Sequence, residues 1–349
     1  MTVEQLDPIH DPRWNALLLR HAKASVFHTP AWLRTLRDAY GYESLALTTS
    51  MPGEPLSDGL VVSKVNSWLT GSRLVSVPFA DHCDPLVDST SSLATLVGGL
   101  RERFQSRTRK YIELRPIDPL EVSPFPASAL SPSATFFFHL LDLHPSAESL
   151  YRGFHKSCIQ RKLQRAEREG LVIEHGHSED LLARFYQLFL LTRRRHQLPP
   201  QPLDWFRHLI RNFSEDLVIW IASKNDRPIA AILTLAWRDT VVYKYGCSDA
   251  AFHQLGGMPM LYWEAIQYAK TRNAVRFDLG RSDLDNPGLV TFKSHWGARC
   301  TTLNYYRDTP ASTSAASRFP GSTLARRLLP FLPDSCVTAT GRMLYRHMG

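Results

Sequence analysis

The segment Ser248–Tyr262, SDAAFHQLGGMPMLY, carries the residue types of an anion-binding turn. A strand is expected to end just before it, two glycines follow in a loop, and Pro259 suits the first turn of a helix. Glycines allow a ligand to approach the backbone closely, and the amides at a helix N-terminus attract phosphate groups. We therefore expect Gln254, Gly256 and Gly257 to bind a phosphate-containing cofactor. The alternative is a plain glycine turn that leads into a helix.

The segment Phe277–Ala298, FDLGRSDLDNPGLVTFKSHWGA, places Lys293 after a glycine turn and an aromatic residue. Attack of an amine on an ester or thioester builds negative charge on the carbonyl oxygen, which a fixed cation stabilises. We expect Lys293 to present its ammonium at the end of a strand for this purpose. The alternative is a surface lysine that pairs with Asp283 or Asp285.

Several other polar side chains are candidates for proton transfer. Asp278 lies within an expected strand, where a carboxylate acts as a general base or is satisfied structurally. Asp81 has the same two interpretations. Tyr243 and Tyr245 alternate with Lys244 on an expected central strand, so we expect both phenols on one face. Tyr245 is then a candidate proton donor to a leaving group, and core packing is the alternative.

Three further groups of residues predict no separate catalytic or metal site. His175 and His177 lie two apart in a polar loop without a third ligand, so we expect no bound metal. His82 and Cys83 are adjacent in sequence, but a catalytic Cys–His pair must meet across the fold. Arg193–Arg195 ends an expected helix, where cations are favoured by the helix dipole, and these arginines also suit an anionic donor.

The second half of the chain predicts the order helix, helix, antiparallel meander, helix, strand. The expected elements are a helix from Ser157 to Gly170, a helix from Glu179 to His196, strands at Leu217–Ser223, Ile229–Trp237 and Thr240–Cys247, a helix from Pro259 to Arg272 and a strand at Val275–Leu279. Short turns between the three strands favour antiparallel pairing.

The first half predicts a shorter version of the same order. It contains a helix that begins at Thr29–Pro30, strands at Glu43–Thr49, Gly59–Val65 and Leu74–Val77, a helix at Leu93–Phe104 and a strand at Tyr111–Leu114. RKYIELRP (Arg109–Pro116) and AVRFDLGR (Ala274–Arg281) share a pattern, which indicates either an internal duplication or a chance similarity. We expect domains at 1–115 and 136–308, a Pro- and Ser-rich linker at 116–135, and a basic amphipathic tail at 309–349.

Composition excludes several classes of protein. The 349 residues are 44% hydrophobic and 21% charged, as in a globular protein, and no apolar run approaches the length of a membrane span. The N-terminus lacks the pattern of a signal peptide, and five dispersed cysteines fit a reducing compartment, so we expect a cytoplasmic protein. The net charge of +8 favours an anionic partner, with simple solubility as the alternative.

Several motifs resemble the Fem-type (FemAB) family and its acetyltransferase relatives of envelope and polysaccharide pathways. The FDLG strand, the Gly288–Leu289 turn, Phe292–Lys293 and Trp296–Gly297 are similar to the family's pattern. The helix at Ser149–Gly170 looks like the segment before the family's second domain. VPFADHCDPLVD (Val77–Asp88) resembles its Pro-Phe-x-Asp loop.

The resemblance implies an α/β fold of tandem GNAT-like domains with mixed, largely antiparallel central sheets. It also implies an acyltransferase that binds its amine acceptor, a cell-envelope or polysaccharide precursor, between the domains. Phe292 and Lys293 then line the donor channel, and we assign Asp81 and Arg281 to substrate binding.

Two donors are compatible with this resemblance. The acetyltransferase superfamily holds the coenzyme A pyrophosphate with an Arg or Gln before a Gly-x-Gly or Gly-x-Ala motif, which Gln254 and Gly257 match in part. The long helical hairpin with which some peptidoglycan-bridge enzymes grip tRNA is missing. We therefore favour acyl-CoA, with no permanently bound cofactor, over aminoacyl-tRNA, although Arg161, Arg165 and Arg168 also suit an RNA backbone.

Two further interpretations concern binding. A non-catalytic, anion-binding protein with the same fold is the alternative to an enzyme. The tail combines Leu324, Leu328, Leu329 and Phe331 with basic residues, and such a segment can rest on the anionic inner face of a membrane. The acceptor is then a small or lipid-linked amine. The alternative for the tail is packing against the second domain.

Overall fold

The structure is a computed structural model and describes residues 3–68, 70–104, 109–120, 130–309 and 334–348. Among these, 3–136, 303–309 and 342–348 form a first unit, and 137–302 with 334–341 form a second. The long strands β6 (Ser131–Asp142) and β12 (Arg299–Asp308) contribute residues to both units. β6 begins five residues before the end of the predicted linker 116–135, of which 121–129 lie outside the described residues.

The first unit has the strand order β1-β2-β3-β4-β5-β12. Its elements are β1 (Glu4–Leu6), α1 (Pro12–Arg20), η1 (Val26–His28), α2 (Pro30–Tyr40), β2 (Glu43–Thr48), β3 (Leu60–Ser67), β4 (Gly71–Val75), α3 (Thr90–Arg103) and β5 (Arg109–Leu114). β2, β3 and β4 form an antiparallel meander, β5 pairs parallel to β4, and β12 pairs antiparallel to β5. Leucines of α3 pack on this sheet.

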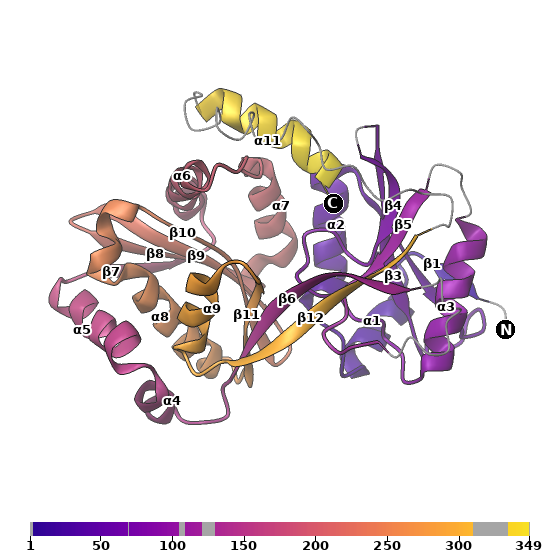
Figure 1. Cartoon of the computed structure of the whole chain (residues 1–349), viewed down its shortest axis with the longest axis horizontal. Coiled ribbons are helices and arrows are strands. Elements are labelled where there is room, and N and C mark those ends of the chain that lie inside the picture. Colours follow the sequence, from indigo (N-terminus) through magenta and orange to yellow (C-terminus); the bar gives the residue numbers. More distant parts are fainter. Residues whose placement is uncertain (1–2, 69, 105–108, 121–129, 310–333, 349) are drawn as a thin grey trace. The chain divides into compact units, whose positions relative to one another are not determined.

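The second unit has the strand order β6-β11-β10-β9-β8-β7 (Figure 1). Its elements are α4 (Ala147–Gly153), η2 (Lys156–Gln160), α5 (Arg161–Arg168), β7 (Val172–Gly176), α6 (Glu179–Arg195), α7 (Leu203–Phe213), η3 (Ser214–Asp216), β8 (Leu217–Lys224), β9 (Arg227–Trp237), β10 (Thr240–Ser248), η4 (Ala250–Leu255), α8 (Gly257–Thr271), β11 (Arg276–Asp283) and α9 (Pro287–Ser294). Helices α6 and α7 cover the face opposite to α8.

Both units follow the same order of elements. In each, two helices precede a three-stranded antiparallel meander, a helix follows, and the next strand pairs parallel to the last strand of the meander. The parallel strands are β5 and β11, which contain the two similar sequence segments noted above. The predicted mixed, largely antiparallel sheets are confirmed.

Local sequence signals explain several boundaries. Thr29 caps α2 by accepting from the amide of Trp32, and Gly41 ends it in the left-handed conformation (φ +72°). The helix predicted to begin at Ser157 begins differently: His155 caps a π-helical turn, η2, which leads into α5. Ser157 is therefore not the cap, because the imidazole of His155 accepts from the amide of Cys158 instead.

A buried ion-pair network fixes the Val77–Asp88 loop of the first unit. Glu113 is 3% exposed and binds Arg115 (2.8 Å) and Arg307 (2.7 Å). Arg115 also donates to the carbonyl oxygens of Val77 and Ala80, both at 3.1 Å. The loop that carries Asp81 is thus held by the strand pair beneath it.

The described end of the tail is helix α11 (Asp334–Met348). The Tyr42 hydroxyl donates to the carbonyl oxygen of Tyr345, and Arg73 donates to that of His347. Residues 342–348 therefore belong to the first unit, whereas residues 334–341 belong to the second. The leucines and phenylalanine predicted to form the amphipathic face lie outside the described residues. Among the described helices, none combines the length and apolarity that crossing a bilayer requires.

Candidate functional site

Strands β10 and β11 pair only over their first residues. The parallel ladder joins Thr240–Val242 to Arg276–Asp278, although β10 continues to Ser248 and β11 to Asp283. The two strands therefore diverge toward their carboxyl ends. Divergence of neighbouring parallel strands leaves backbone groups at this edge available to a ligand.

A cavity of about 280 Å³ opens where β10, α5, α8 and α9 meet. Its walls are mostly aromatic and aliphatic, with a few polar groups. It is lined by Lys162, Ile229, Ala230, Tyr243, Ser248, Phe252, His253, Gly257, Met258, Pro259, Tyr262, Leu289 and Phe292. An apolar pocket with a few convergent polar groups is typical of a ligand site.

A β-bulge on β10 decides which tyrosine reaches this cavity. The register with β9 shifts between Tyr243 and Tyr245, at Lys244. Tyr243 then packs on Tyr262 of α8, with ring centroids 4.7 Å apart, whereas the Tyr245 hydroxyl accepts from Trp205 Nε1 (3.0 Å) on α7. The expectation that both phenols share one face is wrong. Tyr243 lines the cavity. The role of Tyr245 as a proton donor stays a prediction, and its contact with Trp205 on α7 does not favour that role.

The two glycines at the start of α8, Gly256 at the cap and Gly257 as the first residue, allow close packing against neighbouring elements. Gly256 has φ +83°, and a Cβ there would overlap the carbonyl oxygen of Lys162 on α5. A Cβ on Gly257 would lie 3.2 Å from that of Ala230 on β9. The close backbone approach that the sequence predicted is thus made by α5 and β9. Gln254 is exposed and donates to a carbonyl of its own turn, and its cofactor role stays a prediction.

The polar end of the cavity is positively charged. The Ser248 hydroxyl and His253 Nε2 are 2.8 Å apart, and Arg195 donates to the Ser248 carbonyl oxygen (3.1 Å). Burial lowers the pKa of His253, and the nearby Arg195 and Lys162 lower it further. Two cations next to a neutral imidazole favour an anionic group here.

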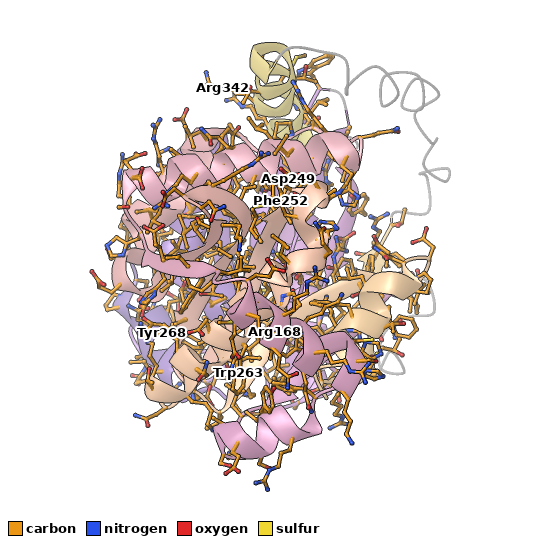
Figure 2. All side chains as sticks on the ribbon, turned by 90° about the vertical axis from the view of Figure 1, so that its left-hand side faces the viewer. Arg168, Asp249, Phe252, Trp263, Tyr268 and Arg342 are labelled. Atoms are coloured by element: carbon orange, nitrogen blue, oxygen red, sulfur yellow. The ribbon has the colours of Figure 1, made fainter. Side chains whose placement is uncertain are left out.

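The turn between β10 and α8 is anchored from β9. Asp249 and Phe252, labelled in Figure 2, both contact Arg227. The guanidinium pairs with the Asp249 carboxylate (2.9 Å) and lies 4.7 Å from the Phe252 ring centroid. Asp249 also accepts from the amide of Ala251. The turn that forms the cavity wall is therefore held in place.

A second cavity, of about 370 Å³, adjoins the first. It is lined by Cys158, Lys162, Pro287, Gly288, Thr291, Phe292 and His295, so Lys162 and Phe292 line both cavities. Sequence reasoning assigned Phe292 to the donor channel but missed Lys162. The available signal was its position on α5 directly before the apolar Leu163, which is buried.

Lys293 is not at the end of a strand but within helix α9, and it is only 2% exposed. Its ammonium donates to the carbonyl oxygens of Gly280 (3.0 Å) and Arg281 (2.8 Å), in the divergent part of β11. Gly280 has φ +70°, which turns its carbonyl out of the regular strand direction. The expectation of a lysine at the end of a strand is wrong, as is the alternative of a surface lysine, and the catalytic role of Lys293 stays a prediction.

The predicted carboxylates and Arg281 lie apart from the cavity lining. Asp278 is buried and accepts from the amide of Gly280 (2.6 Å). The backbone of Asp81 accepts from the Tyr305 hydroxyl (2.6 Å) in the first unit. The general-base role of Asp278 and the substrate-binding roles of Asp81 and Arg281 stay predictions.

The fold brings Cys83 to a histidine that the sequence could not identify. Its sulfur lies 3.4 Å from Nε2 of His28, and both residues are buried. Burial raises the pKa of the Cys83 thiol well above its usual value and lowers that of His28 to about 4. Because both groups stay neutral and buried, the pair is structural rather than nucleophilic.

Residues 154–293 match the family described as the acetyltransferase (GNAT) domain. The chain is also 24% identical over 157 residues to the UDP-N-acetylmuramoylpentapeptide-lysine N(6)-alanyltransferase of Weissella viridescens. That match covers 44% of this chain and 43% of the alanyltransferase, so the chain spans less than half the length of this curated relative.

Solved structures show the same fold. The crystal structure of FemX aligns with a TM-score of 0.71 at 12% identity, over 88% of this chain and 97% of FemX. The tandem GNAT protein from the clavulanic acid biosynthesis pathway aligns with a TM-score of 0.55 at 10% identity, over 90% of this chain and all of that protein. The fold is therefore that of tandem GNAT-like proteins.

Proposed function

We propose that the protein is an acyltransferase that moves an acyl or aminoacyl group onto an amine, as the match of residues 154–293 to the acetyltransferase (GNAT) domain suggests. The observation that carries the proposal is the cavity beside the divergent strands β10 and β11, with a cationic end at Lys162. The domain match and the alanyltransferase relative support the same chemistry.

The geometry suits direct transfer between two bound substrates. The amine nitrogen attacks the donor carbonyl carbon, the new C–N bond forms, and the C–S or C–O bond to the donor breaks. The amine loses a proton and the leaving group gains one. Holding the two reactants together supplies a large share of the acceleration.

In this proposal, residues around the cavity bind the donor and a buried lysine stabilises the developing charge. Phe292 and Tyr243 form the apolar wall along the donor, and Lys162 binds an anionic group at the polar end. Lys293 holds the turned carbonyls of Gly280 and Arg281 and places a buried positive charge beside the divergent strands. Such a fixed charge favours the transition state as negative charge develops on the carbonyl oxygen.

For the donor, we infer an aminoacyl ester rather than the coenzyme A thioester that the sequence favoured. The close approach at Gly256 and Gly257 is occupied by α5 and β9, which weakens the argument for a pyrophosphate. The matched relative is an alanyltransferase, which supports an aminoacyl donor and an amine on a peptidoglycan precursor as acceptor. The net charge of +8 also suits an RNA backbone.

The test is transfer of a radiolabelled group by the purified full-length protein. The donors are bulk aminoacyl-tRNA and acetyl-CoA, and the acceptor is UDP-N-acetylmuramoyl-pentapeptide. We expect label on the acceptor's lysine amine from aminoacyl-tRNA, and little from acetyl-CoA. Transfer from acetyl-CoA alone would reverse the choice of donor. Donor binding without transfer to any amine would favour a non-catalytic anion-binding protein.

Two cations on α5 give a matched pair of variants. Lys162→Ala removes the cation that lines both cavities, whereas Arg168→Ala removes an exposed cation from the same helix. We expect Lys162→Ala to raise the donor KM about tenfold, the loss of one charge-assisted hydrogen bond. Arg168→Ala should leave it within twofold. Equal effects would place the donor along the outer face of α5 instead.

A further inference from the structure

Three metal-ligating side chains meet at the rim of the second cavity. They are His155, Cys158 and His295, and their ligand atoms all lie within 4.8 Å of one another. His155 and Cys158 come from the start of η2, and His295 follows α9, about 140 residues later in the sequence. Cys158 and His295 also line the cavity.

We propose that His155, Cys158 and His295 bind one Zn²⁺ ion, with the remaining coordination position open to the second cavity. Two imidazoles and one thiolate are a ligand set that zinc accepts, and catalytic zinc sites keep three protein ligands and an open fourth position. Thiolate with imidazole favours zinc over magnesium or calcium.

The backbone holds the two halves of this site together. The amide of His155 donates to the carbonyl oxygen of His295 (2.9 Å), and the two imidazole centroids are 4.2 Å apart. Bonds of about 2.0 Å to nitrogen and 2.3 Å to sulfur place ligand atoms about 3.3–3.6 Å apart. Side-chain rotations that bring the ligand atoms closer together by up to about 1.5 Å therefore close the site.

His155 can exchange a present hydrogen bond for a metal ion. His155 Nδ1 accepts from the amide of Cys158 (3.2 Å). Zinc binding to His155 replaces this long bond, and because His155 is exposed, water can satisfy the released amide.

A bound zinc ion would make the second cavity more positively charged. A zinc ion with one thiolate carries a net charge of +1, and Lys162 lies beside it in the same cavity. Once the metal is bound, the cavity gains a second positive centre that attracts an anionic or carbonyl oxygen.

The test is metal binding by the full-length protein, measured by competition with a chromophoric chelator and by spectroscopy with Co²⁺ in place of Zn²⁺. We expect one Zn²⁺ per chain, a thiolate-to-Co²⁺ absorption band, and a rise in Tm with added Zn²⁺. Cys158→Ser should weaken Zn²⁺ at least about a hundredfold, because even outer residues of a zinc site contribute 10- to 100-fold. It should also abolish the Co²⁺ band.

The matched control is Cys300→Ser, which removes an exposed thiol on β12. This variant should bind Zn²⁺ as the wild type does. His295→Gln provides a second variant that keeps every thiol, and it should lose the metal while Tm in a chelator stays unchanged. Zn²⁺ binding that survives both Cys158→Ser and His295→Gln, or the absence of stoichiometric binding by the wild type, would overturn the proposal. None of these measurements depends on transferase activity.

Discussion

Lys293 shows how burial changes the expected effect of a single substitution. An exposed lysine can be truncated without a folding cost, but this buried ammonium on α9 satisfies two carbonyl oxygens of β11. We expect Lys293→Met to lower the free energy of unfolding by about 1–3 kcal/mol, because it leaves buried acceptors unpaired. Since the buried charge acts at the divergent strands, kcat should fall about 10²–10³-fold. Urea unfolding and the transfer assay measure the two effects.

Lys270 separates these two effects. Its ammonium also binds two carbonyl oxygens, those of Leu143 and Pro145 at 2.6 Å, but it does not line either cavity. Lys270→Met should therefore cost some stability and leave kcat unchanged. If both variants lose kcat in proportion to their stability, the ammonium of Lys293 has a structural role only.

His139 gives the second unit a measurable sensitivity to acid. Burial, together with Lys293, lowers the pKa of His139 to about 4, whereas an unfolded histidine titrates near 6.5. The folded state therefore binds fewer protons, and stability is present above pH 6.5 and is lost as the pH falls toward 4, by up to about 3 kcal/mol. His139→Gln should flatten Tm between pH 7 and 4.5.

At the scale of elements, the bulge on β10 predicts opposite outcomes for two neighbouring tyrosines. Tyr243→Ala opens the cavity wall, so we expect the donor KM to rise about tenfold, with a loss of packing against Tyr262. Tyr245→Phe removes only the acceptor of the Trp205 hydrogen bond, at about 1 kcal/mol of stability. Steady-state kinetics and thermal unfolding of both variants measure this. A larger kinetic effect for Tyr245→Phe would restore it as the candidate proton donor.

The sequence predicted elements better than it predicted side-chain directions. Hydrophobic periodicity located β8, β9 and β10 within one or two residues, because a regular pattern integrates many weak preferences. One bulged residue, Lys244, reversed the face of Tyr245, and no local signal marks a bulge. Lys293 was expected at the end of a strand, but it lies in helix α9. Asn286 caps this helix and Pro287 begins it, and the sequence analysis did not use that signal.

Removing Glu113 from its buried ion-pair network should greatly lower the stability of the first unit. Burial raises the pKa of Glu113, but Arg115 and Arg307 outweigh it and hold the pKa below its usual value. Its stabilisation is therefore present at neutral pH and is lost as the pH falls through this low pKa. Glu113→Ala leaves two arginines without their carboxylate and should cost about 3–5 kcal/mol. Glu148→Ala, which breaks an exposed pair, should change stability by less than about 1 kcal/mol. Urea unfolding of both variants checks this contrast.

At the scale of the whole chain, the repeated order of elements explains why the fold could be predicted more fully than the site. Each unit packs its own helices on one antiparallel meander. The same order of elements therefore occurs twice in the sequence, and each occurrence supports the interpretation of the other. The site depends instead on where β10 and β11 stop pairing and on which helix fills the space at Gly256. These contacts join residues far apart in the sequence, and periodicity does not encode them.

The net charge of +8 and the surface at the end of α11 lead to a prediction about membranes. Trp68 is 77% exposed, lies 5.5 Å from the His347 ring, and has exposed Met343, Met348 and Arg346 on the neighbouring helix. Indole, thioether and guanidinium groups together suit the interface of an anionic bilayer.

We therefore expect the full-length protein to co-sediment with vesicles that contain phosphatidylglycerol, and less so with neutral vesicles or at high salt. Trp68→Ser should reduce this binding several-fold, because it removes an aromatic ring that inserts at the interface. Leu19→Ser, at another strongly exposed apolar side chain of the first unit, is the matched control and should pellet as the wild type does. If Trp68→Ser and Leu19→Ser pellet equally, this surface does not contact the bilayer. Any remaining attraction then comes from the net positive charge, which salt should remove completely.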